Sequence, residues 1–249
     1  LKGDVLKDLP DKIVEIKLSR MGDKQRKLYE AAVYQLQAQL EGQREEEFTT
    51  SKLQVLAQLT RLRQFRCDPN LCTEAYDGGS AKLDLCLELL ENAIESGHRI
   101  LVFSQFTSML DILKVRLQEA DISFYTIDGS TDKKERIRLV NEFNEGQVPV
   151  FLISLKAGGY GLNLTGAAMV IHCNPWWNQA VENQATDRAY RMGQTKNVMV
   201  YKLIMKDTIE EKIAHLQESK SALAESILSG EGLSMGTLTQ DDIASLLEI

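Results

Sequence analysis

The sequence predicts an α/β fold built on a doubly wound parallel sheet, with helical segments before and after it. Between residues 81 and 206, short apolar runs rich in β-branched side chains alternate with amphipathic helical patterns of ten or more residues. Such alternation implies right-handed crossovers, which place helices on both faces of a parallel sheet. Polar and glycine-rich segments directly follow the apolar runs, and ligands of these sheets bind where the strands end.

Residues 1–80 are predicted to form an N-terminal helical element. The segment 8–20, DLPDKIVEIKLSR, contains an apolar alternation and is either one strand or a linker. Helical patterns follow from Asp23 to Leu40 and again over residues 53–65, with the charged turn GQREEE between them. The Cys-Asp-Pro-Asn sequence at 67–70 ends the second helix, because proline cannot continue it.

The central segment, residues 81–206, carries the predicted sheet. Helices are expected at 82–95, 108–119, 132–144 and 179–191, and strands at 99–103, 123–127, 148–153, 168–173 and 197–203. The last segment, residues 207–249, opens with the capping-box spacing Asp207-Thr-Ile-Glu210, in which Asp207 would be the N-cap of a helix reaching Ile227. A short acidic helix is expected at 240–247.

The net charge of −7 gives no positive indication of a nucleic-acid partner. Most of the excess acid lies in residues 203–249, with 3 basic and 9 acidic side chains, so the remainder is close to neutral. No run approaches the roughly 20 apolar residues that a membrane span needs, and the first ten residues lack a signal-peptide pattern. We therefore expect a cytoplasmic protein whose four cysteines (Cys67, Cys72, Cys86, Cys173) are reduced and mostly buried.

The most informative stretch is QATDRAYRMGQ, which begins at Gln184. On one helix, Gln184, Arg188 and Arg191 would share a face, because they are spaced by four and three residues. Two guanidinium groups side by side suit a polyphosphate. Alternatively, either arginine could form a structural ion pair with Asp187. The 249 residues contain no phosphate-binding loop of the form G-x-x-x-x-G-K-[ST], so a nucleotide would be held mainly by another domain.

A second signal is the loop SLKAGGYGLNLTGA, which directly follows an apolar strand. Three of its glycines and three of its polar side chains are candidate site residues: Gly158, Gly159, Gly161, Ser154, Lys156 and Asn163. Glycines allow close approach of the backbone, and exposed amides suit a phosphate or a ribose. The alternative is an ordinary strand-to-helix turn.

Two further features have open interpretations. Trp176 and Trp177 follow a strand, so one could pack in the core and one could lie against a sugar or a base. The basic run KKERIR at 133–138 is either a solvated helix face or a phosphate contact. His172 and Cys173 end a strand and are expected to be structural.

These motifs together resemble a known family. LVFSQF, IDGST, ISLKAGGYGLNLTGA, NPWWN and QATDRAYRMGQ resemble the C-terminal RecA-like lobe of the Swi/Snf-type helicase-like ATPases. DLPDK, QRKLYE and LRQFRCDPNLC resemble the inter-lobe helical region, and DTIEEKI the start of the brace helix, so the resemblance covers essentially the whole chain. The two tryptophans and the GLNLTGA ending are more similar to bacterial or archaeal members. The chain departs from the family pattern at Gln179, where proline is usual, and at Asp68, where histidine is common.

The resemblance implies roles by position. Arg188 and Arg191 would be arginine fingers acting on ATP, which an absent first lobe would hold with Mg²⁺. The implied nucleotide-binding residues are Gln184, Gly159, Gly161 and Asn163. The implied DNA-binding residues are Ser104, Gln105, Ser154, Lys156, Ala157, Gly158 and Trp177. The segments 1–80, 81–206 and 207–249 would be the inter-lobe helical region, the RecA-like lobe, and the brace helix with an acidic tail.

The resemblance thus implies the second motor lobe of an ATP-dependent double-stranded DNA translocase or remodeller, associated with the nucleoid. Its partners would be duplex DNA, its own N-terminal RecA-like lobe, and a protein or protein–DNA complex as the remodelling target. The chain alone is expected to bind no metal and to hydrolyse no ATP, since it lacks the phosphate-binding loop. The alternative is a non-catalytic α/β module that binds a protein or a nucleic acid.

Overall fold

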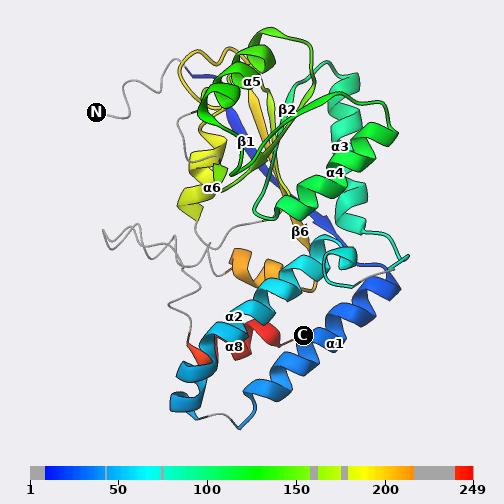
Figure 1. Cartoon of the computed structure of the whole chain (residues 1–249), viewed down its shortest axis with the longest axis vertical. Coiled ribbons are helices and arrows are strands. Elements are labelled where there is room, and N and C mark those ends of the chain that lie inside the picture. The colour runs from blue at the N-terminus through cyan, green and yellow to red at the C-terminus, as the bar shows by residue number, and fades with distance from the viewer. Residues whose placement is uncertain are drawn as a thin grey trace. The chain divides into compact units, whose positions relative to one another are not determined.

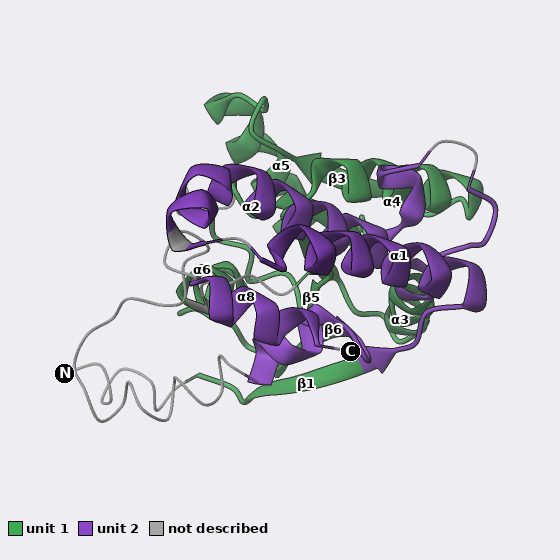
Figure 2. Cartoon of the chain, turned by 90° about the horizontal axis from the view of Figure 1, so that it is seen from below, with its two compact units in different colours: residues 1–17, 85–176, 180–203 green, residues 18–84, 177–179, 204–249 purple. Residues whose placement is uncertain are grey.

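The computed structural model describes residues 9–42, 44–73, 76–157, 162–174, 179–215 and 239–248 (Figure 1). The chain divides into two compact units, which Figure 2 distinguishes by colour. The first unit comprises residues 1–17, 85–176 and 180–203, and the second comprises residues 18–84, 177–179 and 204–249. None of the helices in the described part of the chain combines the length and the apolar character needed to cross a membrane.

A six-stranded parallel sheet organises the chain and confirms the predicted fold class. Its strands are β1 (Lys12–Ser19), β2 (Ile100–Ser104), β3 (Phe124–Ile127), β4 (Val150–Ser154), β5 (Met169–His172) and β6 (Val198–Met205). Their order across the sheet is β1-β6-β5-β2-β4-β3. The segment predicted as a strand or a linker is the edge strand β1. Its parallel alignment with β6 follows from Val198 N donating to Asp11 O (2.9 Å) and Lys206 N donating to Ser19 O (2.8 Å).

Four helices connect the strands: α3 (Ala81–Glu95), α4 (Thr107–Glu119), α5 (Lys133–Glu145) and α6 (Gln179–Thr186). Figure 1 shows α5 and α6 on one side of the sheet and α3 and α4 on the other. The core beneath α5 and α6 contains Phe103, Phe151 and Val170 from the strands, together with Phe143 and Ala185 from the helices. Because the central strands are covered on both faces, they are continuously apolar rather than alternating.

The second unit contains the predicted N-terminal helical element. Helices α1 (Asp23–Leu40) and α2 (Glu45–Cys67) bury apolar residues together with the helical residues 209–215 and with α8 (Gln240–Leu247). The predicted brace helix is described only as far as residue 215, and its remainder to residue 227 lies outside the described residues.

The start of that helix differs from the prediction. Asp207 is not the N-cap: its φ of 58° lies in the left-handed region, and the helix begins at residue 209. Thr208 takes the capping position, since its hydroxyl accepts from Glu210 N at 3.2 Å. The Glu210 carboxylate turns inward and accepts from Met205 N at 2.7 Å. The capping-box spacing was therefore misread, because the glutamate is used in the interior.

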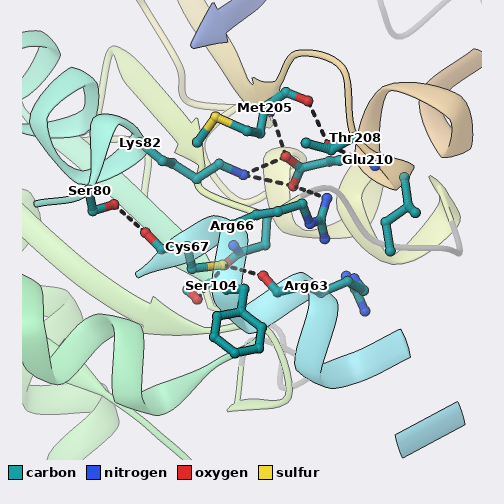
Figure 3. Close-up of polar contacts among 12 residues, drawn as sticks. Arg63, Arg66, Cys67, Ser80, Lys82, Ser104, Met205, Thr208 and Glu210 are labelled. Atoms are coloured by element: carbon teal, nitrogen blue, oxygen red, sulfur yellow. Dashed lines mark hydrogen bonds and ion pairs between the residues drawn. The ribbon is translucent and has the colours of Figure 1, made fainter. Parts of the chain in front are cut away.

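A buried ionic cluster surrounds that glutamate (Figure 3). Lys82 Nζ lies 2.7 and 2.6 Å from the two carboxylate oxygens of Glu210, and Arg66 Nη1 lies 3.3 Å from Oε1. The exposed fraction of the side chain is 0% for Lys82, 2% for Glu210 and 1% for Arg66. Burial alone would raise the pKa of Glu210, but the charges of Arg66 and Lys82 outweigh it and lower the pKa. Nearby, burial raises the pKa of the Cys67 thiol to about 11.

Candidate functional site

The carboxyl ends of β2, β4 and β5 lie side by side in the first unit. Ser104 is in register with Ser154, and Phe103 is in register with His172. The chain order changes direction here, because β4 and β5 flank β2 on opposite sides. This is the topological switch point at which open α/β sheets bind ligands. The sequence placed most of its candidate residues at this edge.

The segment after β2 has a buried serine at its start. Ser104 is 0% exposed, and its hydroxyl donates to Asn174 Oδ1 (2.7 Å) and accepts from Phe106 N (3.0 Å). Gln105 is half-buried. Contact of Ser104 or Gln105 with DNA stays a prediction. In this structure the Ser104 hydroxyl holds the segments that follow β2 and β5 together.

The glycine-rich loop that follows β4 is described at both ends. Ser154 is 2% exposed and Ala157 is 1% exposed, whereas Lys156 and Asn163 are exposed. Lys156 forms no ion pair with any described residue, so its ammonium group is available to an anion. Gly158, Gly159 and Gly161 lie outside the described residues, and so do Trp176 and Trp177.

The arginine motif does not form one continuous helix, contrary to prediction. Helix α6 ends at Thr186, so Gln184 lies on the helix while Arg188 and Arg191 lie in the turn that follows. The backbone hydrogen bonds change at the end of the helix. Arg188 N donates to Ala185 O (3.3 Å) and Ala189 N donates to Thr186 O (3.0 Å), each three residues back rather than four. Farther along, Arg188 O accepts from Leu164 N at 2.9 Å, and Ala189 O accepts from the Gln194 side-chain amide at 3.0 Å.

Two hydrogen bonds fix the arginine turn, residues 187–194, against the glycine-rich loop. Leu164 N of the loop donates to Arg188 O, and the Gln194 side-chain amide donates to Ala167 O of the loop at 2.9 Å. The Gln194 side-chain oxygen accepts from the amides of Thr195 and Lys196. Gly193 has a φ of +97°, which a residue with a Cβ adopts only with strain, so this turn depends on glycine. The two candidate motifs are therefore connected by hydrogen bonds.

The electrostatics of the turn are unusual. Arg188 is 5% exposed, and its Nε has no hydrogen-bond partner among the described residues. Burial lowers the pKa of Arg188, and the nearby charge of Arg191 lowers it further, while Asp187 acts in the opposite direction. Neither arginine lies within ion-pair distance of Asp187 or of another described carboxylate. The structural ion pair that the sequence left open is therefore not formed, and neither guanidinium group has an ion-pair partner among the described residues.

Arg136 is a buried residue of this edge that the sequence did not reveal. Its Nε donates to Thr131 O (2.8 Å), and its two Nη atoms donate to Asp128 O (3.0 Å) and Ala157 O (3.4 Å). It joins the loop after β3 to the glycine-rich loop. The run KKERIR looked like a solvated face, and Arg138 does form exposed ion pairs with Glu135 and Glu142. Only the step of four from Arg136 to the buried Val140 could have indicated that Arg136 points inward.

A cavity of about 610 Å³ opens between α5 and the glycine-rich loop. Its lining includes Lys133, Arg136, Ile137, Leu162 and Asn163. Among the described residues, no group of three His, Cys, Asp or Glu side chains is arranged to hold a metal ion.

The parallel sheet and the polar residues at the carboxyl ends of its strands define the class of protein. Residues 81–193 match the family model described as "Helicase conserved C-terminal domain". The C-terminal domain of the Sulfolobus solfataricus SWI2/SNF2 ATPase superposes with a TM-score of 0.76 at 29% identity, covering 96% of this chain and 99% of that one. The same organism's "SWI2/SNF2 ATPase core in complex with dsDNA" matches with a TM-score of 0.78 and 32% identity, covering 97% of this chain and 51% of that chain.

Two similar curated proteins come from bacteria. A "Putative ATP-dependent helicase/translocase YwqA" of Bacillus subtilis is 38% identical over 96% of this chain and 26% of its own length. An "Uncharacterized ATP-dependent helicase" of Mycoplasma pneumoniae is 36% identical over 99% of this chain and 24% of its own length. The chain belongs to the Snf2-type helicases, of which it is a C-terminal lobe. It spans about a quarter of the length of these curated relatives.

Proposed function

We propose that this chain is the second motor lobe of an ATP-dependent double-stranded DNA translocase or remodeller. In this proposal Arg188 and Arg191 are arginine fingers that act on ATP held by the first lobe. The observation that carries the proposal is a pair of guanidinium groups for which the described residues supply no ion-pair partner. A buried cation without a carboxylate partner is costly, and a polyphosphate entering the turn would supply the missing negative charge.

The cationic side chains of the arginine turn fit a nucleoside triphosphate better than they fit a metal ion. Bound ATP would provide the phosphoryl group that is transferred to water, and the first lobe would hold it together with Mg²⁺. Arg188 and Arg191 would then stabilise the charge that develops on the phosphoryl oxygens, a contribution worth about 10³- to 10⁵-fold in rate in other NTPases. Gln184, exposed on the last turns of α6, would help to orient them. Asn163, Gly159 and Gly161 complete the proposed nucleotide set.

DNA contact is proposed for the glycine-rich loop and the segment after β2. Lys156 is the best supported of these residues, because it is exposed and has no anionic partner among the described residues. Ala157, Gly158 and the backbone near Ser154 would approach the same phosphates, and Trp177 would lie along the duplex. Ser104 would act by holding Asn174, with Gln105 beside it. The hydrogen bond from Leu164 N to Arg188 O supplies a physical route by which DNA contact could affect the arginine turn.

The wider biology is proposed on the same basis. The two bacterial relatives are named as ATP-dependent helicases, and one related structure was determined with double-stranded DNA. We infer that the partners are duplex DNA, the protein's own first lobe and a protein–DNA complex that is remodelled, and that the protein associates with the nucleoid.

The proposal is tested with the full-length protein by measuring ATP hydrolysis with and without duplex DNA. Arg188→Ala should abolish DNA-dependent turnover while leaving DNA affinity near the wild-type value. Arg138→Ala is the matched control, because Arg138 is about half-exposed and its ion-pair partners within the described ranges are both carboxylates of α5. Equal turnover in Arg188→Ala and wild type would refute the proposal and favour a non-catalytic binding module.

A further inference from the structure

Helix α6 is attached to the sheet by polar contacts as well as by apolar packing. On the sheet, His172 of β5 and Lys202 of β6 are neighbours in register. They lie on the same face as Val170 and Val200, which belong to the core beneath α5 and α6. Alternation along each strand therefore directs both polar side chains toward α6.

On the helix, Glu182 and Thr186 are four residues apart and share one face. Glu182 Oε2 lies 2.8 Å from Lys202 Nζ, and Thr186 Oγ1 lies 2.9 Å from His172 Nε2. Two successive helix turns thus contact two adjacent strands through one polar pair each. We call these four residues the α6 seam.

The seam is buried. Glu182, His172 and Thr186 are 1%, 0% and 5% exposed, and the Lys202 side chain is 17% exposed. Burial lowers the pKa of His172 to about 4, so its ring is neutral at pH 7 and stacks on Phe103 with a centroid distance of 5.5 Å. Buried ion pairs add little net stability compared with apolar side chains of the same size, but they do restrict which arrangement is allowed. In this chain the two polar pairs match each turn of α6 to one strand, which non-directional apolar contacts do not specify.

The seam leads directly into the arginine turn. Thr186 is the last residue of α6, and its carbonyl accepts from Ala189 N (3.0 Å) and Tyr190 N (3.1 Å). Arg188 lies two residues beyond the His172–Thr186 contact. A displacement of the end of α6 would therefore displace the Arg188 guanidinium group.

We propose that Glu182, Thr186, His172 and Lys202 are positioning residues that seat α6 and thereby aim the arginine turn for ATP hydrolysis. They contact neither nucleotide nor DNA, and they act through Arg188 and Arg191. The inference rests on the proposed motor function and adds to it four residues, of which only Thr186 belongs to the QATDRAYRMGQ motif.

The test uses the full-length protein with Glu182→Gln, Lys202→Met and the double variant. Each single substitution should lower kcat on the order of a hundredfold, because small misplacement of catalytic groups has effects of that size. The KM for ATP and the Kd for duplex DNA should stay within about twofold. The double variant should be no slower than the single ones, since both remove the same interaction. Hydrogen exchange of residues 187–194 should be faster in all three.

Controls separate positioning from loss of stability. Phe143→Leu alters the same apolar core without touching the seam, so it should lower Tm and leave kcat per folded molecule unchanged. Thr186→Val preserves side-chain shape and removes the hydroxyl, so it carries the test if the charged variants do not fold. It should lower kcat and accelerate exchange in residues 187–194.

Two negative results are distinguishable. In the first, kcat and hydrogen exchange stay at wild-type values in Glu182→Gln, Lys202→Met and Thr186→Val, while Arg188→Ala loses activity. This result would refute the positioning role of the α6 seam and leave the motor function standing. Wild-type turnover in Arg188→Ala would refute the motor role of the turn, and the positioning role with it.

Discussion

Replacing Glu210 with glutamine should destabilise the helical unit strongly. The substitution keeps the side-chain volume but removes the charge that pairs with two buried cations. Lys82 Nζ lies 2.7 and 2.6 Å from the two carboxylate oxygens and Arg66 Nη1 lies 3.3 Å from one of them, and the described residues offer neither cation another carboxylate. All three side chains are at most 2% exposed, so water cannot replace the lost interaction. Breaking such a buried pair costs about 3–5 kcal/mol, which for a chain of this size lowers Tm by roughly 10 °C.

The assay is thermal unfolding followed by calorimetry, with Lys24→Met as the matched control. Lys24 also pairs with a carboxylate, Asp77 at 2.9 Å, but the two side chains are 65% and 81% exposed. Its loss should not change Tm measurably. If Glu210→Gln and Lys24→Met unfold at the same temperature, the argument from burial is wrong.

The same cluster makes a prediction about pH. Because the folded-state pKa of Glu210 is below its ordinary value of 4.5, its stabilising effect is complete above that pH. As pH falls through the lower folded-state pKa, the carboxylate is protonated and the stabilisation is lost. Wild-type stability should therefore fall in acid more steeply than that of Glu210→Gln.

Three other outcomes are expected. Burial lowers the pKa of His172 from its ordinary 6.5 to about 4, so the free energy of unfolding of the wild type should fall by about 3 kcal/mol as the pH drops from 6.5 to 4. Urea titrations of His172→Gln should lack this pH dependence. The same pH dependence in both proteins would show that the ring is accessible. Duplex DNA binding should weaken steeply as the salt concentration rises. Lys156→Ala should reduce the slope of the log association constant against the log salt concentration by about one. An unaltered slope would show that Lys156 does not contact DNA phosphates. The 249-residue chain alone should not hydrolyse ATP at a useful rate, and DNA-stimulated turnover in a coupled assay would contradict this.

The sequence predicted the sheet well, since each of the five expected strands starts and ends within two residues of its observed position. Buried parallel strands are continuous apolar runs between helices, so local composition marks them directly. The edge strand β1 was less certain. Its side chains at Ile13, Val14, Ile16 and Leu18 are about half-exposed, and the partner that makes it a strand lies far along the chain.

The local geometry of the site could not be predicted in the same way. Residues 187–191 have ordinary helix-forming side chains, yet beyond Thr186 the amides of Arg188 and Ala189 bond carbonyls only three residues back, and Arg188 O accepts from Leu164 N. Similarly, Arg136 lies in a basic run, but it donates to Thr131 O and Asp128 O of the loop before α5 and to Ala157 O of the glycine-rich loop. The contacts made by Leu164 N and Ala157 O join segments that are separated in the sequence, and no local pattern encodes them.

The most direct test of the central claim is the kcat of DNA-dependent ATP hydrolysis by full-length Arg191→Ala. Arg191 is exposed and has no ion-pair partner among the described residues, so its removal should leave Tm and DNA affinity unchanged. The account predicts a fall in kcat of about 10³-fold or more, because the guanidinium group acts on charge that develops in the transition state. A folded Arg191→Ala protein with wild-type kcat would contradict it.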